Sequence, residues 1–536
     1  MRLAVTDLHK WASRKEVLFI NQYHTPQEEL STGAVDYTAN AITRAQQLYP
    51  ALRAHSLKAV VKERRFDTTD IDLAGRQFST GLEESPVTAH AGLMATIMAG
   101  AGNSSPFAKG VADGSLVGSV NFQNLFPESD SFYRHHHITV QNHSYGTVVE
   151  NFYGNEAAAF DAAAWNHNHL LLVYSSGNAG STTAGNGAYG NIIGAATLTG
   201  NFKQSKNSLV VGAVDSALQI MSGASKGPTF DGRIKPEVVA YGEDGTSGAA
   251  ALASGTALLV ADAYKQKKGE AAPAHLLKAA IINGAADVGT PGPDYASGFG
   301  NIDAAASVHS ILQNQFFTDS LNRGEEKSFT VNVPAQTAHL RATLVWTDVP
   351  ALPGSGKALV NDLDFQMTEA ATGTVLQPWV LNSAPHPDSI VAAAKRSLDT
   401  LNNTEQISVT NPAAGVYRFT IKFTKGQSGR QRFSVVYQLD SLQHFAITHP
   451  LHTTPVIAAS RQRIRWETTA TGPVQIAYKT TTSTWQPIAV VDAAEKYAVW
   501  ELPDVAAIAQ VRATLVSSNK IIYSDSFVIS KQPLLK

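Results

Sequence analysis

One serine of the chain stands where a protein could use it as a nucleophile. Ser247 follows a glycine and a threonine and precedes small residues, in the segment DGRIKPEVVAYGEDGTSGAAA (231–251). The glycine permits a tight turn, and the start of the helix that the small residues predict favours negative charge near the hydroxyl. A serine that only caps a helix has the same local pattern. The tripeptide therefore indicates nucleophilic chemistry only if other residues join it.

A histidine and an asparagine supply the partners that such a serine needs. His90 begins HAGLMATIMAG, an alanine- and glycine-rich helix whose start would hold the imidazole as a general base. Asn178 lies in SSGNAG, after the apolar run LLLVYSS, where its amide could stabilise an oxyanion together with the Ser247 backbone N–H. A histidine in the core and a Gly-Asn turn are the plainer explanations of these two motifs. Their occurrence in one chain, in this order, favours catalysis.

These segments together resemble the subtilisin-like serine protease family, peptidase family S8. DGRIKPEVVAYG and GTSGAAA are similar to the family's nucleophile region, HAGLMATIMAG to its histidine motif and SSGNAG to its oxyanion motif. The resemblance implies an endopeptidase with Ser247 as nucleophile, His90 as base and Asn178 in the oxyanion hole. It implies that substrate backbone pairs with Ser144, Tyr145 and Gly146. It also implies a side-chain pocket, expected to take uncharged residues, that is lined by Ser175, Ser176 and Gly177.

The acidic member of the triad departs from the family pattern. Aligning the end of the family's first motif with residues 70–73 places Glu63 where the family has its catalytic aspartate. A glutamate can accept the Nδ1 proton of His90 if the strand end is set back by about one methylene, roughly 1.5 Å. Alternatively, Glu63 is a surface residue in the charge run at 62–65, and the anion is supplied by Asp67, Asp70 or Asp72, or by no residue.

The elements that must position these residues are of two kinds. The apolar runs SLKAVV, LLLVYSS and NSLVVGAV predict buried parallel strands, with alanine-rich helices between them. We therefore expect an α/β subtilisin-like catalytic domain at 56–310, after a lead-in segment at 1–55 that includes a helix in AVDYTANAITRAQQLYP. Alternating patterns predict two antiparallel sandwiches. The one at 311–442 resembles a jelly-roll barrel, and the one at 443–536 resembles a fibronectin-III-like domain.

Composition excludes several other classes. A chain of 536 residues predicts about three domains. The absence of cysteine excludes a disulfide scaffold, a thiolate metal site and cysteine catalysis. A net charge of −2 gives no field for nucleic acid, and no apolar run is long enough to span a membrane. The first residues lack the layout of a signal peptide. We expect a cytoplasmic protein if Met1 is the true start, and a secreted or cell-envelope bacterial protein if a leader was removed.

Catalysis by these residues requires no cofactor, but one segment has the residues of a structural calcium site. KALVNDLDFQ places Asn361, Asp362 and Asp364 at the start of a strand, where their oxygens could bind Ca²⁺. An ordinary Asx turn uses the same residues. The adjacent histidines at 135–137 point to opposite faces of an extended chain and do not have the spacing of metal ligands.

The sequence thus predicts a monomeric serine endopeptidase that acts on polypeptides. Two alternatives stay open. The altered acid motif would suit a binding protein with the subtilase fold and no activity. The missing signal peptide would suit a dedicated protease that matures one leader peptide inside the cell.

Overall fold

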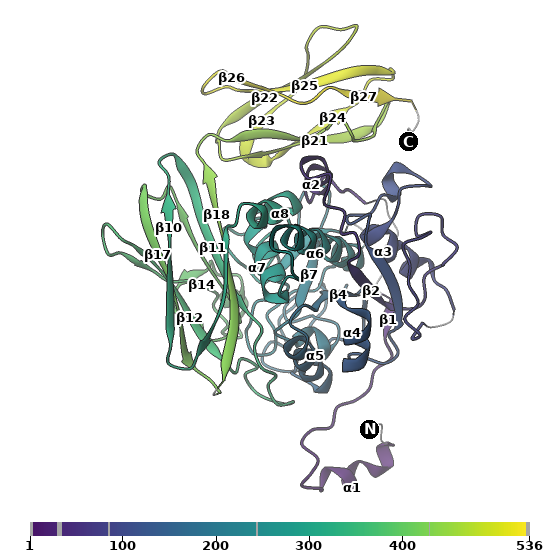
Figure 1. Cartoon of the computed structure of the whole chain (residues 1–536), viewed down its shortest axis with the longest axis vertical. Helices are drawn as coiled ribbons and strands as arrows, with labels where there is room; N and C mark the ends of the chain where they lie inside the picture. Colours follow the sequence, from purple (N-terminus) through teal and green to yellow (C-terminus); the bar gives the residue numbers. More distant parts are fainter. Residues whose placement is uncertain (1–3, 29–34, 84–85, 243–244, 428, 532–536) are drawn as a thin grey trace.

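The computed structural model describes residues 4–28, 35–83, 86–242, 245–427 and 429–531 (Figure 1). A six-stranded sheet lies at the centre of its first half, with every neighbouring pair parallel and the order β3-β2-β4-β6-β7-β8. The strands are β2 (Lys58–Glu63), β3 (Leu116–Asn121), β4 (Ile138–His143), β6 (Leu171–Ser175), β7 (Leu209–Val214) and β8 (Val238–Tyr241). The predicted α/β class with a parallel sheet is confirmed.

Helices cover both faces of this sheet, so five of its strands, β2, β3, β4, β6 and β7, contribute side chains to two hydrophobic cores. In β2, Val61 lies in the larger core and its neighbour Val60 lies in the core on the other face. Strands buried on both sides are continuously apolar, which is why the three runs were recognisable. The larger core contains α3 (Ala89–Ala99), α6 (Thr246–Lys268), α7 (Ala274–Gly284) and α8 (Ala304–Leu312), and the other contains α4 (Asp130–His136) and α5 (Asn155–Asn166). Within the described part of the chain, no helix combines the length and apolar character needed to cross a bilayer.

Short elements precede the sheet: η1 (Val5–Asp7), α1 (Leu8–Ala12), β1 (Gln27–Glu28) and α2 (Ile42–Leu48). The helix predicted in this region ends before Pro50 as expected but begins only at Ile42. Asp36 accepts hydrogen bonds from the Thr38 N–H at 3.0 Å and from its hydroxyl at 2.5 Å. Such local side-chain bonds offer the backbone an alternative to helix.

The first antiparallel region consists of two four-stranded sheets with a common core, in the orders β10-β17-β12-β13 and β16-β11-β18-β9. Helix α7 packs on β11 and β18, which joins this region to the central sheet. The strands are β9 (Phe316–Asn322), β10 (Glu326–Val333), β11 (Thr337–Trp346), β12 (Asp362–Glu369), β13 (Val375–Leu376), β16 (Thr404–Thr410), β17 (Gly415–Lys425) and β18 (Arg430–Ser441). A small excursion holds β14 (Trp379–Val380), α9 (Pro387–Ile390) and β15 (Lys395–Arg396).

The second antiparallel region has its own hydrophobic core and lies beyond α2 in Figure 1. One sheet has the order β19-β21-β24. The other has the order β20-β27-β25-β22-β23, with β26 beside β25 and one parallel pair, β20 with β27. The elements are β19 (Phe445–His449), β20 (Val456–Ile457), β21 (Arg461–Thr468), β22 (Pro473–Thr480), β23 (Gln486–Asp492), η4 (Ala493–Glu495), β24 (Tyr497–Glu501), β25 (Ala507–Leu515), β26 (Lys520–Tyr523) and β27 (Phe527–Ser530). The predicted antiparallel character of the C-terminal half is confirmed, whereas the domain boundaries stay a prediction.

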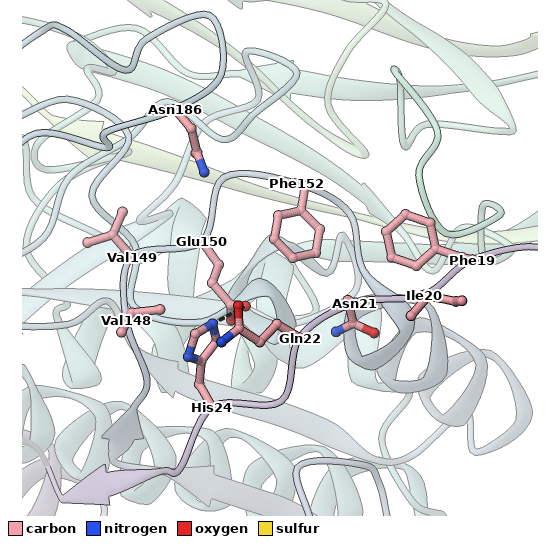
Figure 2. Close-up of a pocket in the computed structure, with 10 residues that line it drawn as sticks. All are labelled: Phe19, Ile20, Asn21, Gln22, His24, Val148, Val149, Glu150, Phe152 and Asn186. Carbon is pink, nitrogen blue, oxygen red and sulfur yellow. Dashed lines mark ion pairs between the residues drawn. The ribbon is translucent and has the colours of Figure 1, made fainter. Parts of the chain in front are cut away.

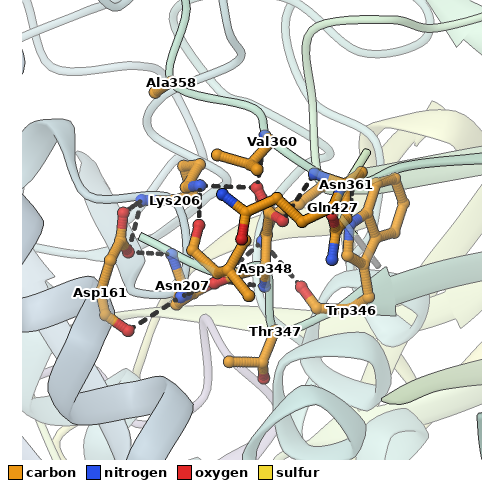
Figure 3. A network of polar contacts seen from close by, with 12 residues as sticks. Asp161, Lys206, Asn207, Trp346, Thr347, Asp348, Ala358, Val360, Asn361 and Gln427 are labelled. Carbon is orange, nitrogen blue, oxygen red and sulfur yellow. Dashed lines mark hydrogen bonds and ion pairs between the residues drawn. The ribbon is translucent and has the colours of Figure 1, made fainter. Parts of the chain in front are cut away.

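A buried polar network connects the loop before β7 to the loop after β11 (Figure 3). Lys206 Nζ forms an ion pair with Asp348 Oδ2 at 2.5 Å, and both side chains are fully buried. Asn207 donates to the Asp348 carbonyl and accepts from its N–H, each at 2.8 Å. Asp161 accepts from the backbone N–H groups of Lys206 and Asn207, both at 2.9 Å. Both a buried ion pair and amide hydrogen bonds therefore connect the central sheet to the first antiparallel region.

Candidate active site

A glutamate and a histidine meet at the carboxyl edge of the central sheet. Glu63 is the last residue of β2, and its Oε2 lies 2.6 Å from His90 Nδ1. The Glu63 side chain is fully buried and that of His90 is 9% exposed. Thr88 caps helix α3 by accepting a hydrogen bond from the Ala91 N–H at 3.3 Å, and the first turn of this helix carries His90. The geometry fits a carboxylate that fixes the tautomer and orientation of an imidazole.

Two members of the charge run around Glu63, Lys62 and Glu63 itself, are buried, whereas Arg64 and Arg65 are half-buried. Lys62 points to the opposite face of β2 from Glu63, as alternation along a strand requires, and forms a buried ion pair with Glu128. The aspartates that could have replaced Glu63 are engaged locally. Asp67 accepts from the Thr69 N–H at 2.8 Å, and Asp72 accepts from the Ser104 N–H at 3.1 Å. Among these carboxylates, the structure pairs Glu63 with His90.

Ser247 lies in the first turn of α6, one residue after the helix begins. The preceding Gly245 has a φ of +146°, a conformation that favours glycine. Ser247 Oγ donates to the Ser144 carbonyl at 3.3 Å, and Ser144 Oγ donates to the Ser247 carbonyl at 3.1 Å. Helices α3 and α6 pack together, and each follows a strand of the parallel sheet. Their first turns, which carry His90 and Ser247, therefore lie at the same edge.

Hydrogen bonds to its carbonyl oxygen fix the orientation of the Asn178 side chain. Its Oδ1 accepts from the Thr246 N–H at 3.0 Å and from the Thr246 hydroxyl at 3.2 Å. Thr246 Oγ1 in turn accepts from the Gly177 N–H at 3.1 Å. Because the oxygen is held next to Ser247, the amide Nδ2 is the end that can donate, and Asn178 is exposed. The arrangement suits an oxyanion donor.

The strand predicted to bind substrate is already paired with a segment of the same chain. β5 (Tyr145–Gly146) pairs antiparallel with β1, with Gln27 opposite Gly146 and Glu28 opposite Tyr145. The Glu28 carboxylate accepts from the Thr88 hydroxyl at 2.7 Å. Its ligand atoms, and those of Glu63 and His90, all lie within 4.8 Å of one another. Residues 27–28 thus lie on the edge where the sequence places an incoming peptide.

The wall predicted to line the side-chain pocket contains a charge that the sequence did not indicate. Ser175 and Gly177 are buried, and Lys203 Nζ lies 3.4 Å from Ser175 Oγ and 2.8 Å from Thr199 Oγ1. Lys203 is itself fully buried, on η3 (Asn201–Gln204). Burial lowers the pKa of His143 well below its usual value, and the charges of Lys62 and Lys203 lower it further. The expectation that this pocket takes uncharged side chains stays a prediction.

The sequence comparison identifies this part of the chain. Residues 78–300 match the sequence model of the subtilase family. This part of the chain is similar to that family and forms a subtilase-like domain. They include His90, Asn178 and Ser247, whereas Glu63 lies before the matched range, where the acid motif departs from the family pattern.

Two curated relatives are both serine protease/ABC transporter B family proteins of Dictyostelium discoideum. The chain is 26% identical to tagA over 262 residues, which is 39% of this chain and 15% of the relative. It is 32% identical to tagB over 130 residues, which is 22% of this chain and 7% of the relative. The chain thus matches a small part of each of these long proteins.

Several solved structures are similar to parts of the chain. The patellamide maturation protease PatA is 17% identical, covers 48% of this chain and 98% of its own, and superposes with a TM-score of 0.37. The subtilisin-like protease Apa1 of Pseudoalteromonas sp. AS-11 is 13% identical, with coverages of 51% and 98% and a TM-score of 0.38. Tripeptidyl peptidase 2 is 12% identical, with coverages of 80% and 46% and a TM-score of 0.33.

A cavity of about 390 Å³ lies between the N-terminal segment and the chain after β5 (Figure 2). Figure 2 shows the ion pair between His24 and Glu150, whose Nε2 and Oε1 atoms are 3.9 Å apart. Asn21 donates to Glu156 at 2.9 Å and accepts from Asn155 at 2.7 Å. Asn21 and His24, which both line this cavity, therefore tie the N-terminal segment to the rest of the chain.

The predicted calcium residues lie far along the chain from the subtilase-like domain, on β12. Asp362 is buried, its Oδ1 has no hydrogen-bond partner, and burial raises its pKa to about 6. Asp364 contributes to this rise and Lys357 opposes it. Within the described ranges, the group of metal-ligating side chains with ligand atoms inside 4.8 Å consists of Glu28, Glu63 and His90, and it does not include Asp362 or Asp364. Calcium binding stays a prediction.

Two features of the site are not indicated by any sequence motif. Lys203 lies in TLTGNFKQSKN, a polar stretch without a motif, and only the fold buries it beside Ser175. Thr88 was identifiable as a helix cap before an apolar run, but its bond to Glu28 joins residues 60 positions apart.

Proposed function

We propose that the protein is a serine endopeptidase that cleaves peptide bonds through an acyl-enzyme. The observation that supports this most directly is the buried hydrogen bond between Glu63 and His90, at the same sheet edge as Ser247. Burying a carboxylate costs free energy of folding, and a pairing of this kind is weak evidence for stability alone. A catalytic role would explain why the chain keeps it. The subtilase match supplies the family context, since peptides are the substrates of proteases.

In this mechanism, the substrate lies as an extended strand along Tyr145–Gly146. Ser247 Oγ attacks the scissile carbonyl carbon, and His90 takes the hydroxyl proton on Nε2 while Glu63 accepts its Nδ1–H. The carbonyl oxygen becomes an oxyanion that Asn178 Nδ2 and the Ser247 N–H stabilise. Collapse of this intermediate breaks the C–N bond, and His90 gives its proton to the leaving amine. Water, deprotonated by His90, then releases the acyl group and restores Ser247.

An inactive binding protein is the alternative that the altered acid motif raised. The contact between Glu63 and His90 favours the active form instead, because the glutamate reaches the histidine without an aspartate. A dedicated leader-peptide protease is a narrower form of the same proposal. A monomeric state, catalysis without a cofactor, and either a cytoplasmic or an exported location also stay predictions.

A fluorophosphonate probe that reacts with activated serines tests the proposal. We expect wild-type protein to be labelled and to cleave casein, and Ser247→Ala to do neither. Ser222→Ala is the matched control, because Ser222 is exposed, and it should behave as wild type. Wild-type protein that is folded by circular dichroism but unlabelled would favour the binding protein.

A further inference from the structure

The pairing of β1 with β5 gives a path for an extended peptide across the proposed active site. β1 runs antiparallel to β5, with Glu28 opposite Tyr145. A substrate strand that ran in the same direction would continue towards Ser144, whose carbonyl accepts a hydrogen bond from the Ser247 hydroxyl at 3.3 Å. The chain just before β1 therefore marks where the earlier residues of such a substrate would lie.

The cavity of about 390 Å³ lies along this earlier part of the path (Figure 2). Its walls come from the N-terminal segment, from the chain just after β5 and from Asn186. Phe19 and Phe152 make part of the wall apolar, with their ring centroids 6.2 Å apart. Among the described residues that line the cavity, the ionisable side chains are those of His24 and Glu150. The cavity thus combines apolar walls with one carboxylate.

Hydrogen bonds to one of its oxygens hold the Glu150 carboxylate in place. Oε2 accepts from the Asn201 N–H at 2.9 Å, from the Asn201 side-chain amide at 3.3 Å and from the Thr147 hydroxyl at 3.1 Å. Oε1 faces His24, whose Nε2 is 3.9 Å away, which is too far for a hydrogen bond. Burial raises the pKa of Glu150, and the bonds from Asn201 and the charge of His24 oppose the rise. A cation that donated to Oε1 would stabilise the carboxylate further.

His24 indicates which residue of a substrate would reach Glu150. It lies four positions before Glu28, the residue that pairs with Tyr145. Histidine is charged only when it is protonated, whereas lysine and arginine are charged at neutral pH. Their side chains are also longer than that of histidine, and the cavity beside His24 has room for the extra length. A basic side chain would therefore make a stronger contact with the carboxylate than His24 makes.

We propose that this cavity is a substrate subsite for a basic side chain, lysine or arginine, and that Glu150 is the residue that determines this specificity. The proposal rests on the proposed protease function and names its substrate class. The basic residue lies four positions before the substrate residue opposite Tyr145, and five before the residue opposite Ser144, whose carbonyl Ser247 attacks. It takes the place of His24 when substrate displaces the N-terminal segment. Its ammonium or guanidinium group donates a charge-assisted hydrogen bond to Glu150.

The test compares peptides that differ only in arginine, lysine or citrulline at this position. Citrulline has the shape of arginine without its charge. With wild-type protein we expect kcat/KM for arginine and for lysine to exceed that for citrulline by about 10-fold or more, as a hydrogen bond to a charged group requires. Glu150→Gln should bring these ratios to near one while the citrulline peptide is cleaved as before. Glu326→Gln, an identical change at an exposed position of β10, should keep the wild-type ratios.

Two results of this comparison would overturn the proposal. One is equal cleavage of the arginine and citrulline peptides by active wild-type protein. The other is an unchanged preference for arginine in folded, active Glu150→Gln, which would mean that a different group recognises the charge.

A binding measurement separates this inference from the proposed function. Fluorescence anisotropy with labelled arginine and citrulline peptides on Ser247→Ala reports selection without cleavage. Tighter binding of the arginine peptide, together with wild-type protein that the fluorophosphonate never labels, would contradict the protease function and keep the subsite. Labelled, active wild-type protein that cleaves both peptides equally would have the opposite meaning. If Glu150→Gln does not fold, the two peptides on wild-type protein and on Ser247→Ala still decide the question.

Discussion

Glu63 shows how a longer acidic side chain can serve where a shorter one is usual. It ends β2 and reaches His90 Nδ1 at 2.6 Å while remaining fully buried. Its neighbour Lys62 faces the other way and is neutralised by Glu128. Alternation along one strand therefore separates a structural ion pair from the proposed catalytic pair.

Glu63→Gln should slow fluorophosphonate labelling by a factor on the order of 10⁴, because an amide cannot hold the tautomer that the base needs. Glu63→Asp should be intermediate, since its carboxylate stops about one methylene short. The measurement is the second-order labelling rate at equal folded protein. Asp67→Asn is the control, because the carboxylate of Asp67 bonds to Thr69. If Asp67→Asn slows labelling and Glu63→Gln does not, the acid is wrongly assigned.

The raised pKa of Asp362 makes the stability of the first antiparallel region depend on pH. Its folded pKa, about 6, is above the usual aspartate value of 3.8. The protonated form is therefore favoured by folding, and stability is lost as the pH rises through about 6. We expect Ca²⁺ to offset this loss, raising the melting temperature at pH 7.5 more than at pH 5, and Asp362→Asn to abolish the calcium effect. A melting temperature that is unchanged by Ca²⁺ and by EDTA would contradict the predicted site.

The β1 strand, two residues long, pairs with β5, the edge on which substrate is predicted to lie. A peptide and residues 27–28 cannot occupy β5 at the same time. Asn21 anchors the segment through bonds to Glu156 and Asn155. The N-terminal segment is therefore expected to compete with substrate.

Asn21→Asp places a second carboxylate against the buried Glu156 and should loosen the segment. We expect casein cleavage to rise several-fold in this full-length variant. Leu18→Asp adds the same charge at a side chain that is 78% exposed and should leave the rate unchanged. A free peptide of residues 19–28 should restore inhibition to Asn21→Asp. Unchanged cleavage by folded Asn21→Asp would show that the segment does not compete.

The sequence predicted those elements whose signal is local. Strands buried on both faces are continuously apolar, and His90, Asn178 and Ser247 follow or begin such elements in recognisable motifs. The pairing of Glu28 with Tyr145 and the burial of Lys203 depend on contacts between distant segments. A strand of two residues has no periodicity, and a lysine in a polar stretch predicts exposure. The roles assigned to the site residues stay predictions.

The joint between the central sheet and the first antiparallel region depends on a buried ion pair. Lys206 and Asp348 are both fully buried, and burial raises the pKa of Asp348 while Lys206 opposes the rise. Asn207 adds bonds in both directions across the same joint (Figure 3). The two regions are thus expected to unfold together.

Lys206→Met should lower the free energy of unfolding by about 3–5 kcal/mol, because Asp348 is left as an uncompensated buried charge. The double variant Lys206→Met/Asp348→Leu should recover part of this loss. Urea unfolding followed by tryptophan fluorescence measures both, with Lys422→Met as control. A loss in the double variant equal to the sum of the two single losses would mean that the pair is not coupled.

Because residues 19–28 belong to the same chain as the proposed active site, they would compete with substrate at a fixed local concentration that dilution cannot lower. For a short flexible tether this effective concentration is on the order of millimolar. A peptide that makes few contacts would lose this competition to residues 19–28. A peptide that binds along the whole edge would displace them. The two-residue ladder between β1 and β5 would then act as an affinity threshold, set by the chain itself, that favours long peptides over short ones.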